Sequence, residues 1–439
     1  APVHRVSASP TSMEEALARA RTQLDAYYDA ALGGWGTPQK YPFAAPIEHA
    51  LFRGELARVT ASLRGYRALI DPVAGGMFQY SLDGVWTKPH YEKLLSIQAG
   101  AVAVFSAAHR AGAGPDFLGD AQKIARYVLT TLRAADGAFV ASQAADVGSI
   151  GEPGFMAGAQ YYASAQRGRA PDLDTHVYTD LNGMMIAALC ELYRADGDPT
   201  WLRAAGDALH AVQQRLARGP AFLHAGELTE DFYLSDQVEM ARAMDAYALA
   251  SGDATHHRHA NATLDWTLEH LRDADSGGFF SHSATHGIFR DRRVPFEHNA
   301  KLAQLLLARG HIDDEPRFTA LAEGALHALS SPDRVQNQGR QIGDYALALE
   351  QRVGPYVMFS VVGEPNDPAT RALLAAAFRA YVPNGIVSVS GPQESRYPYP
   401  GHAVIYLCSD DACSSPIRDA AALPAALASF RSVSATQSR

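Results

Sequence analysis

Residues 183–216 read GMMIAALCELYRADGDPTWLRAAGDALHAVQQRL, and this stretch decides the fold class. In its first half the apolar residues Met185, Leu189 and Leu192 recur at i, i+4 and i+7, the period of an amphipathic helix, and the second half has the same period. The Asp-Gly-Asp at residues 196–198 interrupts this period, as glycine at a helix end does. The stretch therefore predicts two helices joined by a short turn.

The same periodicity occurs along most of the chain, with frequent alanine where two helices must approach closely. We expect further helices at residues 14–30, 47–70, 91–111, 117–134, 237–251, 256–271, 296–308, 315–329 and 343–351. Taken in pairs, these segments predict an all-α-dominated architecture of repeated helical hairpins.

After residue 352 the pattern changes to short apolar runs rich in β-branched residues. Strands are expected at residues 356–362, 386–390 and 403–407, and helices at residues 369–381 and 417–430. We therefore divide the chain into a helical barrel, residues 1–352, and a small C-terminal β-α-β appendage with a closing helix, residues 353–439.

The composition of the 439 residues restricts the class of protein. There are 38 lysines and arginines against 47 aspartates and glutamates, a net charge of −9 that argues against nucleic acid or an anionic membrane as the main partner. The most apolar stretch, around residues 99–108, is interrupted by Ser106 and followed by His109 and Arg110, so no membrane span is expected.

The chain starts at Ala1, which cleavage of a signal peptide would explain, so we expect export ahead of a cytoplasmic location. Three cysteines are too few for a disulfide scaffold. Cys408 and Cys413 are expected to form a disulfide in an exported protein and to be free thiols in a cytosolic one. Cys190 lies in the middle of a helix and is interpreted as a small core residue.

Glycine next to an aromatic residue recurs at the helix ends, in segments 33–36, 75–78, 136–139 and 275–280. One interpretation is turn chemistry, because glycine supplies positive φ and the ring folds back on the core. The other is that these loops gather at one end of a helical toroid and line a pocket with rings. Long loops alternating with short ones favour the second interpretation.

Residues 75–95, GGMFQYSLDGVWTKPHYEKLL, resemble a signature of the spermatogenesis-associated protein 20-like family, whose members carry a thioredoxin-like domain. Further stretches resemble the family in the same order: 33–42, 136–146, LNGMM at 181–185, and the C-x4-C at 408–413 followed by Ser-Ser-Pro. The chain differs from the family pattern at Leu181, where the family has tryptophan, and at Ala144, where it has aspartate.

The resemblance implies an (α/α)6 toroid (a six-hairpin barrel) related to N-acylglucosamine 2-epimerase and to six-hairpin glycosidases. It covers the family's barrel part without the thioredoxin-like domain, and this sequence contains no C-x-x-C. A thioredoxin-like protein is therefore one expected partner, and a sugar-like small molecule the other.

The block around His90 is the first candidate for chemistry. His90 precedes an expected helix, whose dipole favours a neutral imidazole that can act as a general base. Asp83 and Glu92 add carboxylates and Trp86 adds a ring that suits a hydroxylated substrate. The alternative is structural, with Glu92 and Lys93 paired between helices and His90 as a capping group.

Epimerase-type chemistry needs a second acid/base group on the opposite face of the substrate. His298, at the start of an expected helix after an arginine-rich loop, is the candidate for that role. Asp236 matches a family position and is a candidate carboxylate of a glycosidase-like pair. The first interpretation of Asp180 and Asn182 is that they are helix N-cap residues.

The expected substrate-binding residues supply rings, amides or ammonium groups in the same loops. They are Trp35, Lys40, Tyr80, Trp86, Lys93, Asn182 and Phe279. No metal site is expected, because the histidines at 256, 257 and 259 open a helix of the expected outer layer without cysteine or carboxylate at ligand spacing.

No Walker A, G-x-G-x-x-G, H-E-x-x-H or G-x-S-x-G motif occurs, so no cofactor is expected and the corresponding enzyme classes are set aside. The sequence favours a carbohydrate-active protein, an epimerase, isomerase or hydrolase with acid/base chemistry in an aromatic-lined pocket. The alternative is a non-catalytic ligand-binding or partner-docking barrel associated with a thioredoxin-type redox system.

Overall fold

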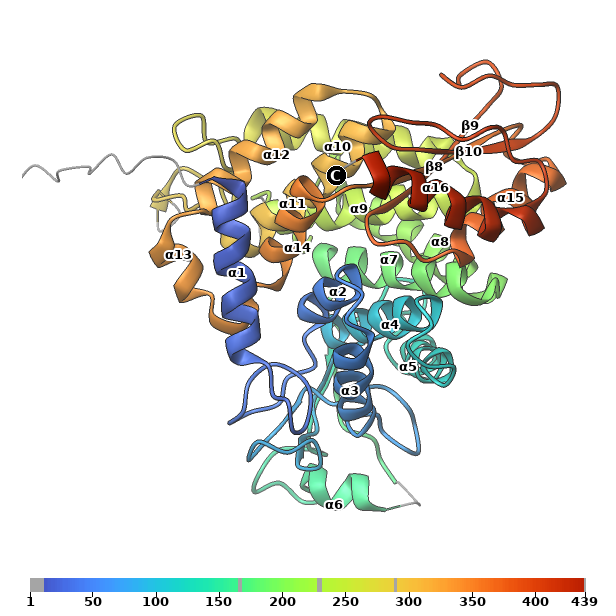
Figure 1. Ribbon diagram of the computed structural model, residues 1–439. Coiled ribbons are helices and arrows are strands. Elements are labelled where there is room, and N and C mark those ends of the chain that lie inside the picture. The colour runs from blue at the N-terminus through green and yellow to red at the C-terminus, as the bar shows by residue number, and fades with distance from the viewer. Residues whose placement is uncertain (1–11, 165–167, 227–230, 288–289, 438–439) are drawn as a thin grey trace, which may run out of the picture.

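The computed structural model describes residues 12–164, 168–226, 231–287 and 290–437. Within these residues, six helices form an inner ring in which each helix contacts the next and the last contacts the first (Figure 1). The inner helices are α2 (Ala44–Phe52), α4 (Leu95–Arg110), α7 (Thr179–Asp196), α9 (Leu234–Ser251), α11 (Phe296–Ile312) and α14 (Gly343–Val353).

An outer helix packs behind each inner helix. The outer helices are α3 (Leu56–Arg67), α5 (Phe117–Thr131), α8 (Pro199–Leu216), α10 (Ala254–His270), α12 (Pro316–Leu329) and α1 (Met13–Tyr27). The first five follow α2, α4, α7, α9 and α11 in sequence, whereas α1 packs on α14 and so closes the ring. The expected (α/α)6 toroid is confirmed.

Burial explains why the outer and the inner helices differ in which residues they bury. The outer helix α8 buries one face, with Trp201, Leu209 and Val212 in the core. The inner helix α9 buries apolar residues such as Met240 together with the polar Glu239, because its other side faces the axis of the toroid. No helix of the described residues is long and apolar enough to span a membrane.

Two expected helices of the toroid differ in extent from those of the structure. The single helix expected at residues 47–70 is two helices, α2 and α3, because the chain turns at Gly54, where φ is +70°. The helix expected at residues 91–111 begins only at Leu95. The residues before it form the short strands β2 (Pro89–His90) and β3 (Lys93–Leu94).

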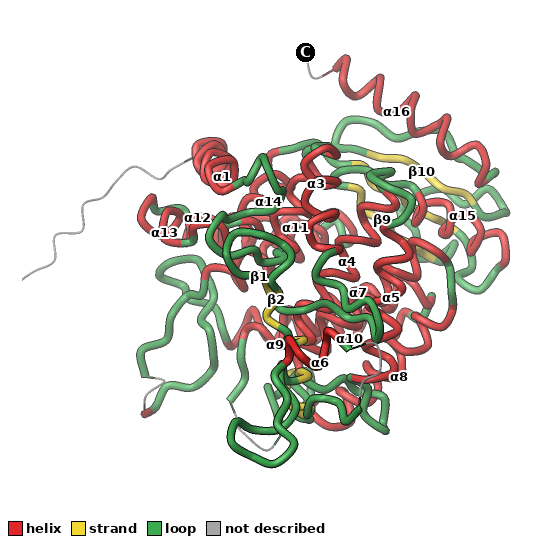
Figure 2. The backbone as a smooth tube through the Cα atoms, turned by 90° about the horizontal axis from the view of Figure 1, so that it is seen from below, coloured by secondary structure: helices red, strands yellow, loops and turns green. Residues whose placement is uncertain are grey.

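The long connections all precede an inner helix, so they lie at one end of the toroid, which we call the loop end (Figure 2). They hold two short helices, α6 (Gly158–Ala163) and α13 (Pro332–Asn337), and further short strands: β1 (Tyr80–Ser81), β4 (Ser142–Gln143), β5 (Leu173–Asp174), β6 (Ala217–Arg218) and β7 (Ala221–Phe222). Strand β1 pairs with β2, β4 lies between β3 and β5, and β6 pairs with β7.

A repeated amide clamp orders these connections. The fourth residue of α4, α7, α9 and α11 is an amide that bonds both backbone groups of a residue in the preceding turn. Asn299, for example, accepts from the Phe279 N–H at 2.7 Å and donates to the Phe279 carbonyl at 2.9 Å. The turn interpretation of the glycine-aromatic segments therefore holds, since Phe139 and Phe279 are buried in the core.

The C-terminal appendage covers the opposite end of the toroid. Its elements are β8 (Val357–Val362), α15 (Pro368–Arg379), β9 (Gly385–Ser390), β10 (Val404–Cys408) and α16 (Leu423–Gln437). In the sheet, β8 is parallel to β9 and antiparallel to β10, which confirms a small C-terminal sheet. Arg371 and Arg396 dock it by donating to the carbonyls of Ala250, at 2.8 Å, and His311, at 3.0 Å.

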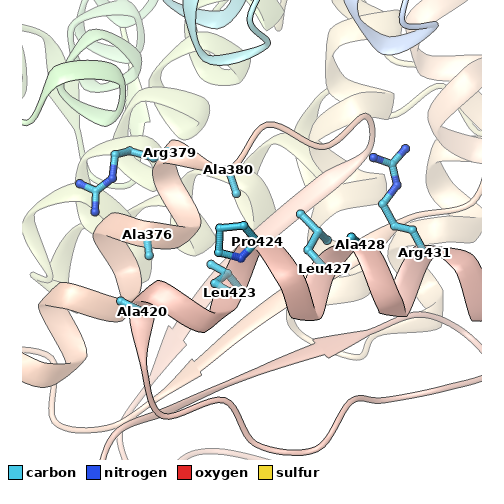
Figure 3. A pocket seen from close by; sticks show the side chains of 9 residues that line it. All are labelled: Ala376, Arg379, Ala380, Ala420, Leu423, Pro424, Leu427, Ala428 and Arg431. Atoms are coloured by element: carbon cyan, nitrogen blue, oxygen red, sulfur yellow. The ribbon is translucent and has the colours of Figure 1, made fainter.

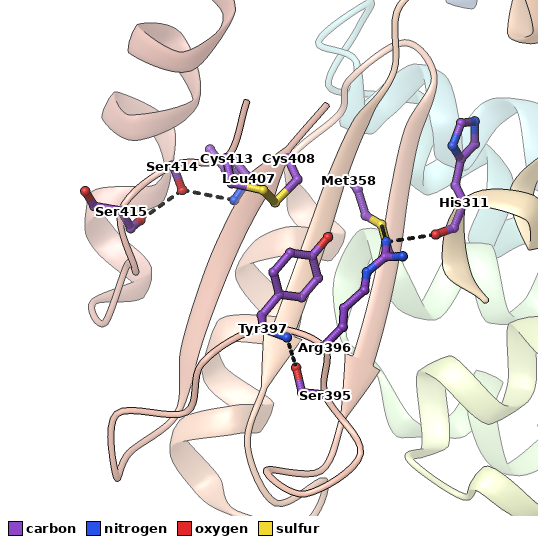
Figure 4. The surroundings of a disulfide bond; sticks show 10 residues. All are labelled: His311, Met358, Ser395, Arg396, Tyr397, Leu407, Cys408, Cys413, Ser414 and Ser415. Carbon is purple, nitrogen blue, oxygen red and sulfur yellow. Dashed lines mark hydrogen bonds between the residues drawn. A yellow bond between two sulfur atoms is a disulfide. The ribbon is translucent and has the colours of Figure 1, made fainter. Parts of the chain in front are cut away.

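The closing helix begins at Leu423 instead of residue 417, after a 3-10 turn at Ala420–Ala422. Cys408 and Cys413 are joined by a disulfide at the end of β10 (Figure 4). Cys190 is a buried free cysteine, as expected.

Candidate functional site

A cavity of about 670 Å³, which we call the axial cavity, runs along the middle of the inner ring. All six inner helices contribute to its wall, with small residues such as Gly100 and Ala103 on α4 and charged residues on α9, α11 and α14. Its volume lies within the roughly 300–1,000 Å³ that is typical of small-molecule sites.

The two ends of the axial cavity differ. At the loop end, Tyr41 and Phe43 line it just before α2. At the other end the appendage packs against the wall: the guanidinium of Arg194 lies 5.0 Å from the ring centroid of Phe378, and that of Arg110 lies 5.7 Å from Tyr381. We call the end lined by Tyr41 and Phe43, opposite to the appendage, the cavity mouth.

Four charged side chains from α9 and α11 form what we call the Lys301 cluster. Lys301 Nζ lies 3.0 Å from Glu239 Oε1 and 2.9 Å from Glu297 Oε1. Arg242 Nη1 lies 3.2 Å from Glu239 Oε2. Glu239 is almost fully buried, whereas 55% of the Glu297 side chain is exposed, and both line the axial cavity.

The cations of this cluster keep both carboxylates ionised. Burial would raise the pKa of Glu239, but Lys301 and Arg242 outweigh it and lower the pKa to about 2. The charge of Lys301 is the largest influence on Glu297 and lowers its pKa as well. Two ionised carboxylates therefore face the axis from α9 and α11.

Two other acids of the cavity wall are shifted in the opposite direction. Burial raises the pKa of Asp344, in the first turn of α14, to about 7 despite the attraction of Lys301. Burial also raises the pKa of Glu48 on α2. The cavity thus combines an acid that keeps its proton near neutral pH with carboxylates that have lost theirs.

Glycine at position 183 allows the close packing that places Glu239. A Cβ atom built on Gly183 would lie 2.7 Å from the backbone carbon of Glu239, a distance that requires the chain to move. Gly183 thus lets α7 approach α9 directly beside the Lys301 cluster.

A stack of aromatic rings connects the cavity mouth with His90. Ring centroids are 5.5 Å apart between Phe43 and Tyr41, 4.7 Å between Tyr41 and Tyr80, and 4.9 Å between Tyr80 and His90. Arg340 covers the first two rings with its guanidinium 5.0 Å from Tyr41. His90 and Tyr80 are thus near the mouth but not among the residues that line the axial cavity.

The other residues expected in the His90 block lie in two different environments. Asp83 is exposed in a surface turn, with Lys88 Nζ at 2.7 Å, and Glu92 is half-buried in the backbone pairing of the β1–β2 hairpin. Lys93 is fully buried, 2.8 Å from Asp71, inside a group of aromatic rings. The pair expected between Glu92 and Lys93 is thus replaced by one between Asp71 and Lys93.

The remaining expected substrate-binding side chains have structural partners. Lys40 is buried between Asp29 and the Gly33 carbonyl, and Trp86 donates to the Leu32 carbonyl at 2.9 Å. Asn182 is one of the amide clamps. Two rings and an amide of this set, Trp35, Phe279 and Asn182, are buried and do not line the axial cavity.

Two of the expected catalytic residues, His298 and Asp236, lie in the first turns of the inner helices α11 and α9, but neither lines the axial cavity. His298 is next to Glu297 and helps to lower the pKa of both Glu297 and Glu239. Asp236, one turn before Glu239 on α9, lies 3.0 Å from His224 Nδ1. Burial raises the pKa of Asp236 to about 7.

The sequence analysis did not single out the Lys301 cluster or Asp344, because their burial and their partners on neighbouring inner helices are not visible in the linear sequence. A signal was present in α9, where the charged residues Asp236, Glu239, Arg242 and Asp245 recur every third position of a helix that is otherwise mostly apolar. Charges on an apolar helix face indicate a polar site inside the fold.

A second hollow lies on the appendage, away from the toroid axis. It has a volume of about 400 Å³ between α15 and α16, with apolar residues such as Leu423 and Leu427 between Arg379 and Arg431 (Figure 3). It holds none of the acid/base groups described above.

No protein-family model matches the chain. Solved structures nevertheless share its fold. One is a sugar epimerase from a ruminal bacterium, which is 12% identical and matches over 70% of this chain and 85% of its own, with a TM-score of 0.54. Another is a D-mannose isomerase, which is 11% identical and matches over 74% of this chain and 87% of its own, with a TM-score of 0.56. A glycoside hydrolase family 76 mannosidase from Bacteroides thetaiotaomicron is 12% identical and matches over 77% of this chain and 99% of its own, with a TM-score of 0.55. The protein is thus an (α/α)6 toroid of the class found in sugar epimerases, isomerases and glycoside hydrolases.

In sequence, the chain is distantly homologous to spermatogenesis-associated protein 20. It is 30% identical to the Mus musculus protein over 151 residues, which are 31% of this chain and 19% of that relative. The Homo sapiens protein is 30% identical over 138 residues, 28% of this chain and 17% of the relative. The matched segment thus spans about a fifth of the length of these relatives.

Proposed function

We propose that the protein is a carbohydrate-active enzyme that hydrolyses a glycosidic bond in the axial cavity. The observation that carries this proposal is the pairing of Asp344, whose pKa is raised to about 7, with the ionised Glu297, in the first turns of neighbouring inner helices. Two carboxyl groups with opposite protonation are the usual requirement for glycoside hydrolysis.

In this reaction Asp344 donates its proton to the leaving-group oxygen as the glycosidic C–O bond breaks. The carboxylate of Glu297 assists the addition of water to the sugar carbon and takes up a proton from it, so that one water is consumed per bond. Lys301 is a positioning residue, because it holds Glu239 and Glu297 in place and ionised.

Carboxyl chemistry is favoured over histidine-based epimerisation by the composition of the wall. Among the described residues that line the axial cavity there is no histidine, whereas Glu48, Glu239, Glu297 and Asp344 all line it. The rings of Tyr41 and Phe43 at the mouth offer faces for the C–H surfaces of a sugar.

The test is a turnover assay on a panel of aryl glycosides and disaccharides, with products followed by NMR in D₂O. We expect new reducing ends without deuterium at the sugar carbons. The rate should fall as pH rises through about 7, because Asp344 must keep its proton. Deuterium incorporation next to an unbroken glycosidic bond would instead indicate epimerisation and overturn the proposal.

A further inference from the structure

We propose that Asp180, His224 and Asp236 bind one divalent transition-metal ion of the Zn²⁺ class at the loop end of the toroid. This site goes beyond the hydrolytic function proposed above, which uses the side chains of α11 and α14. The three residues come from the first turn of α7, the loop after β7 and the first turn of α9.

The three side chains present their ligand atoms at the spacing of a metal site. One such atom from each residue lies within 4.8 Å of the other two. His224 Nδ1 is 3.0 Å from Asp236 Oδ1 and 3.9 Å from Asp180 Oδ1. Ligand atoms at about 2.0–2.1 Å from a tetrahedral Zn²⁺ lie roughly 3.3 Å apart, so small side-chain rotations complete the set.

Asp236 has a carboxylate oxygen that the protein leaves unsatisfied. Its side chain is fully buried, and Oδ1 accepts from the Asp180 N–H at 3.1 Å and faces His224. The other oxygen, Oδ2, is buried without a hydrogen-bond partner among the described residues. A buried carboxylate oxygen is costly to leave without a donor, and a bound cation would satisfy it.

The surroundings hold the three residues in place. The backbone N–H of Thr179 donates to the His224 carbonyl at 3.0 Å, and its hydroxyl donates to the Leu223 carbonyl at 2.5 Å, which ties the His224 loop to the start of α7. The rings of Tyr178 and Tyr233 flank the imidazole at 5.0 Å and 5.5 Å.

The donor set indicates the class of metal. One imidazole nitrogen and two carboxylate oxygens suit Zn²⁺ or a related transition ion, while Ca²⁺ and Mg²⁺ prefer oxygen alone. Two negative charges would be balanced by a divalent cation. With three protein ligands a position stays open for water or another small ligand.

The experiment measures Zn²⁺ binding to the full, untagged chain after removal of metals by a chelator. Calorimetry should show one Zn²⁺ per chain, unaffected by millimolar Ca²⁺, and Co²⁺ should give the visible absorption of a low-symmetry site. The variants are Asp236→Asn, His224→Gln and Asp180→Asn, each checked for native circular dichroism. The matched control is His259→Gln, in the histidine cluster of the outer helix α10.

A group that only supports a metal ligand contributes roughly 10–100-fold to metal affinity. We expect each of the three variants to lose more Zn²⁺ affinity than that, while His259→Gln binds Zn²⁺ as the natural chain does. If Asp236→Asn does not fold, the test is made with His224→Gln and Asp180→Asn, whose positions are more exposed. The proposal is overturned if the natural chain binds no Zn²⁺, or if the folded variants keep its affinity. Turnover of a glycoside by the chelated enzyme is a separate readout and tests the hydrolytic proposal alone.

Discussion

Arg21 and Glu350 join the first helix of the toroid to the last through a bidentate ion pair. Arg21 Nε and Nη2 each lie 2.7 Å from one oxygen of the Glu350 carboxylate. His49 of α2 approaches the same carboxylate, with Nε2 3.2 Å from Oε1. The buried Glu350 therefore ties α1, α2 and α14 together at the seam where the ring closes.

Substitution Glu350→Gln should destabilise the fold by about 2–4 kcal/mol, because it removes a buried carboxylate from the partly exposed Arg21 and the buried His49. The measurement is urea unfolding at pH 7. The matched control is Glu323→Gln, which breaks the surface pair with Arg352 at 2.6 Å and should cost at most about 1 kcal/mol. Equal effects of the two substitutions would contradict a special role for the seam.

The same carboxylate predicts acid sensitivity. Burial opposes ionisation of Glu350, but His49 and Arg21 prevail and lower its pKa from 4.5 to about 2. Because the folded value lies below the unfolded one, the contribution of Glu350 is complete above pH 4.5 and is lost as the pH falls towards 2. Unfolding free energies measured from pH 6 to 3 should fall less steeply in Glu350→Gln; parallel profiles would rule this out.

Loss of an amide clamp should lower the free energy of unfolding and leave catalysis unchanged. Asn182→Ala removes the bonds to both backbone groups of Phe139 and to the Tyr178 carbonyl, and it should cost about 2–4 kcal/mol. The exposed Asn337 offers the control Asn337→Ala, expected within about 0.5 kcal/mol of the natural chain. Unfolded Asn182→Ala protein at 25 °C, or no loss of stability, would each count against this estimate.

The disulfide predicts the result of thiol counting. Denatured, unreduced protein from an oxidising compartment should show one free thiol, Cys190, because Cys408 and Cys413 are bonded. So short a loop removes little chain entropy, so the bond should contribute less than the roughly 3 kcal/mol of a 15-residue loop. Three free thiols in that preparation would contradict the pairing.

The helical repeat could be predicted from sequence because apolar periodicity reports burial directly, as in residues 183–216. The boundaries at Gly54 and Leu95 could not, since they depend on a turn and on strand pairing with distant loops. The rings at 139 and 279 were expected in a pocket, because the sequence does not show that an asparagine on the next inner helix fixes each turn against the core.

The candidate site was harder to predict from the sequence than the fold. Lys93 and Trp86 look like binding residues in a loop, yet their partners, Asp71 and the Leu32 carbonyl, lie far away in the sequence. Glu297 and Asp344 come to line the same cavity only through the packing of the inner helices α11 and α14. Their pKa shifts arise from burial and from Lys301, neither of which a linear motif contains.

The most direct test of the central claim, that the axial cavity is the sugar site, is calorimetric titration of matched variants with a sugar that binds the natural chain. Ala103→Phe places a large ring in the cavity, and Glu297→Gln removes a carboxylate from its wall. His90→Ala alters the outer end of the aromatic stack and serves as the control.

We predict that Ala103→Phe abolishes binding, that Glu297→Gln weakens it about 10-fold or more, and that His90→Ala changes it less than about threefold. Folding of each variant is checked by its unfolding midpoint. Loss of binding in His90→Ala with full affinity in Ala103→Phe would contradict the account, because it would place the site in the β1–β2 hairpin instead of the axial cavity.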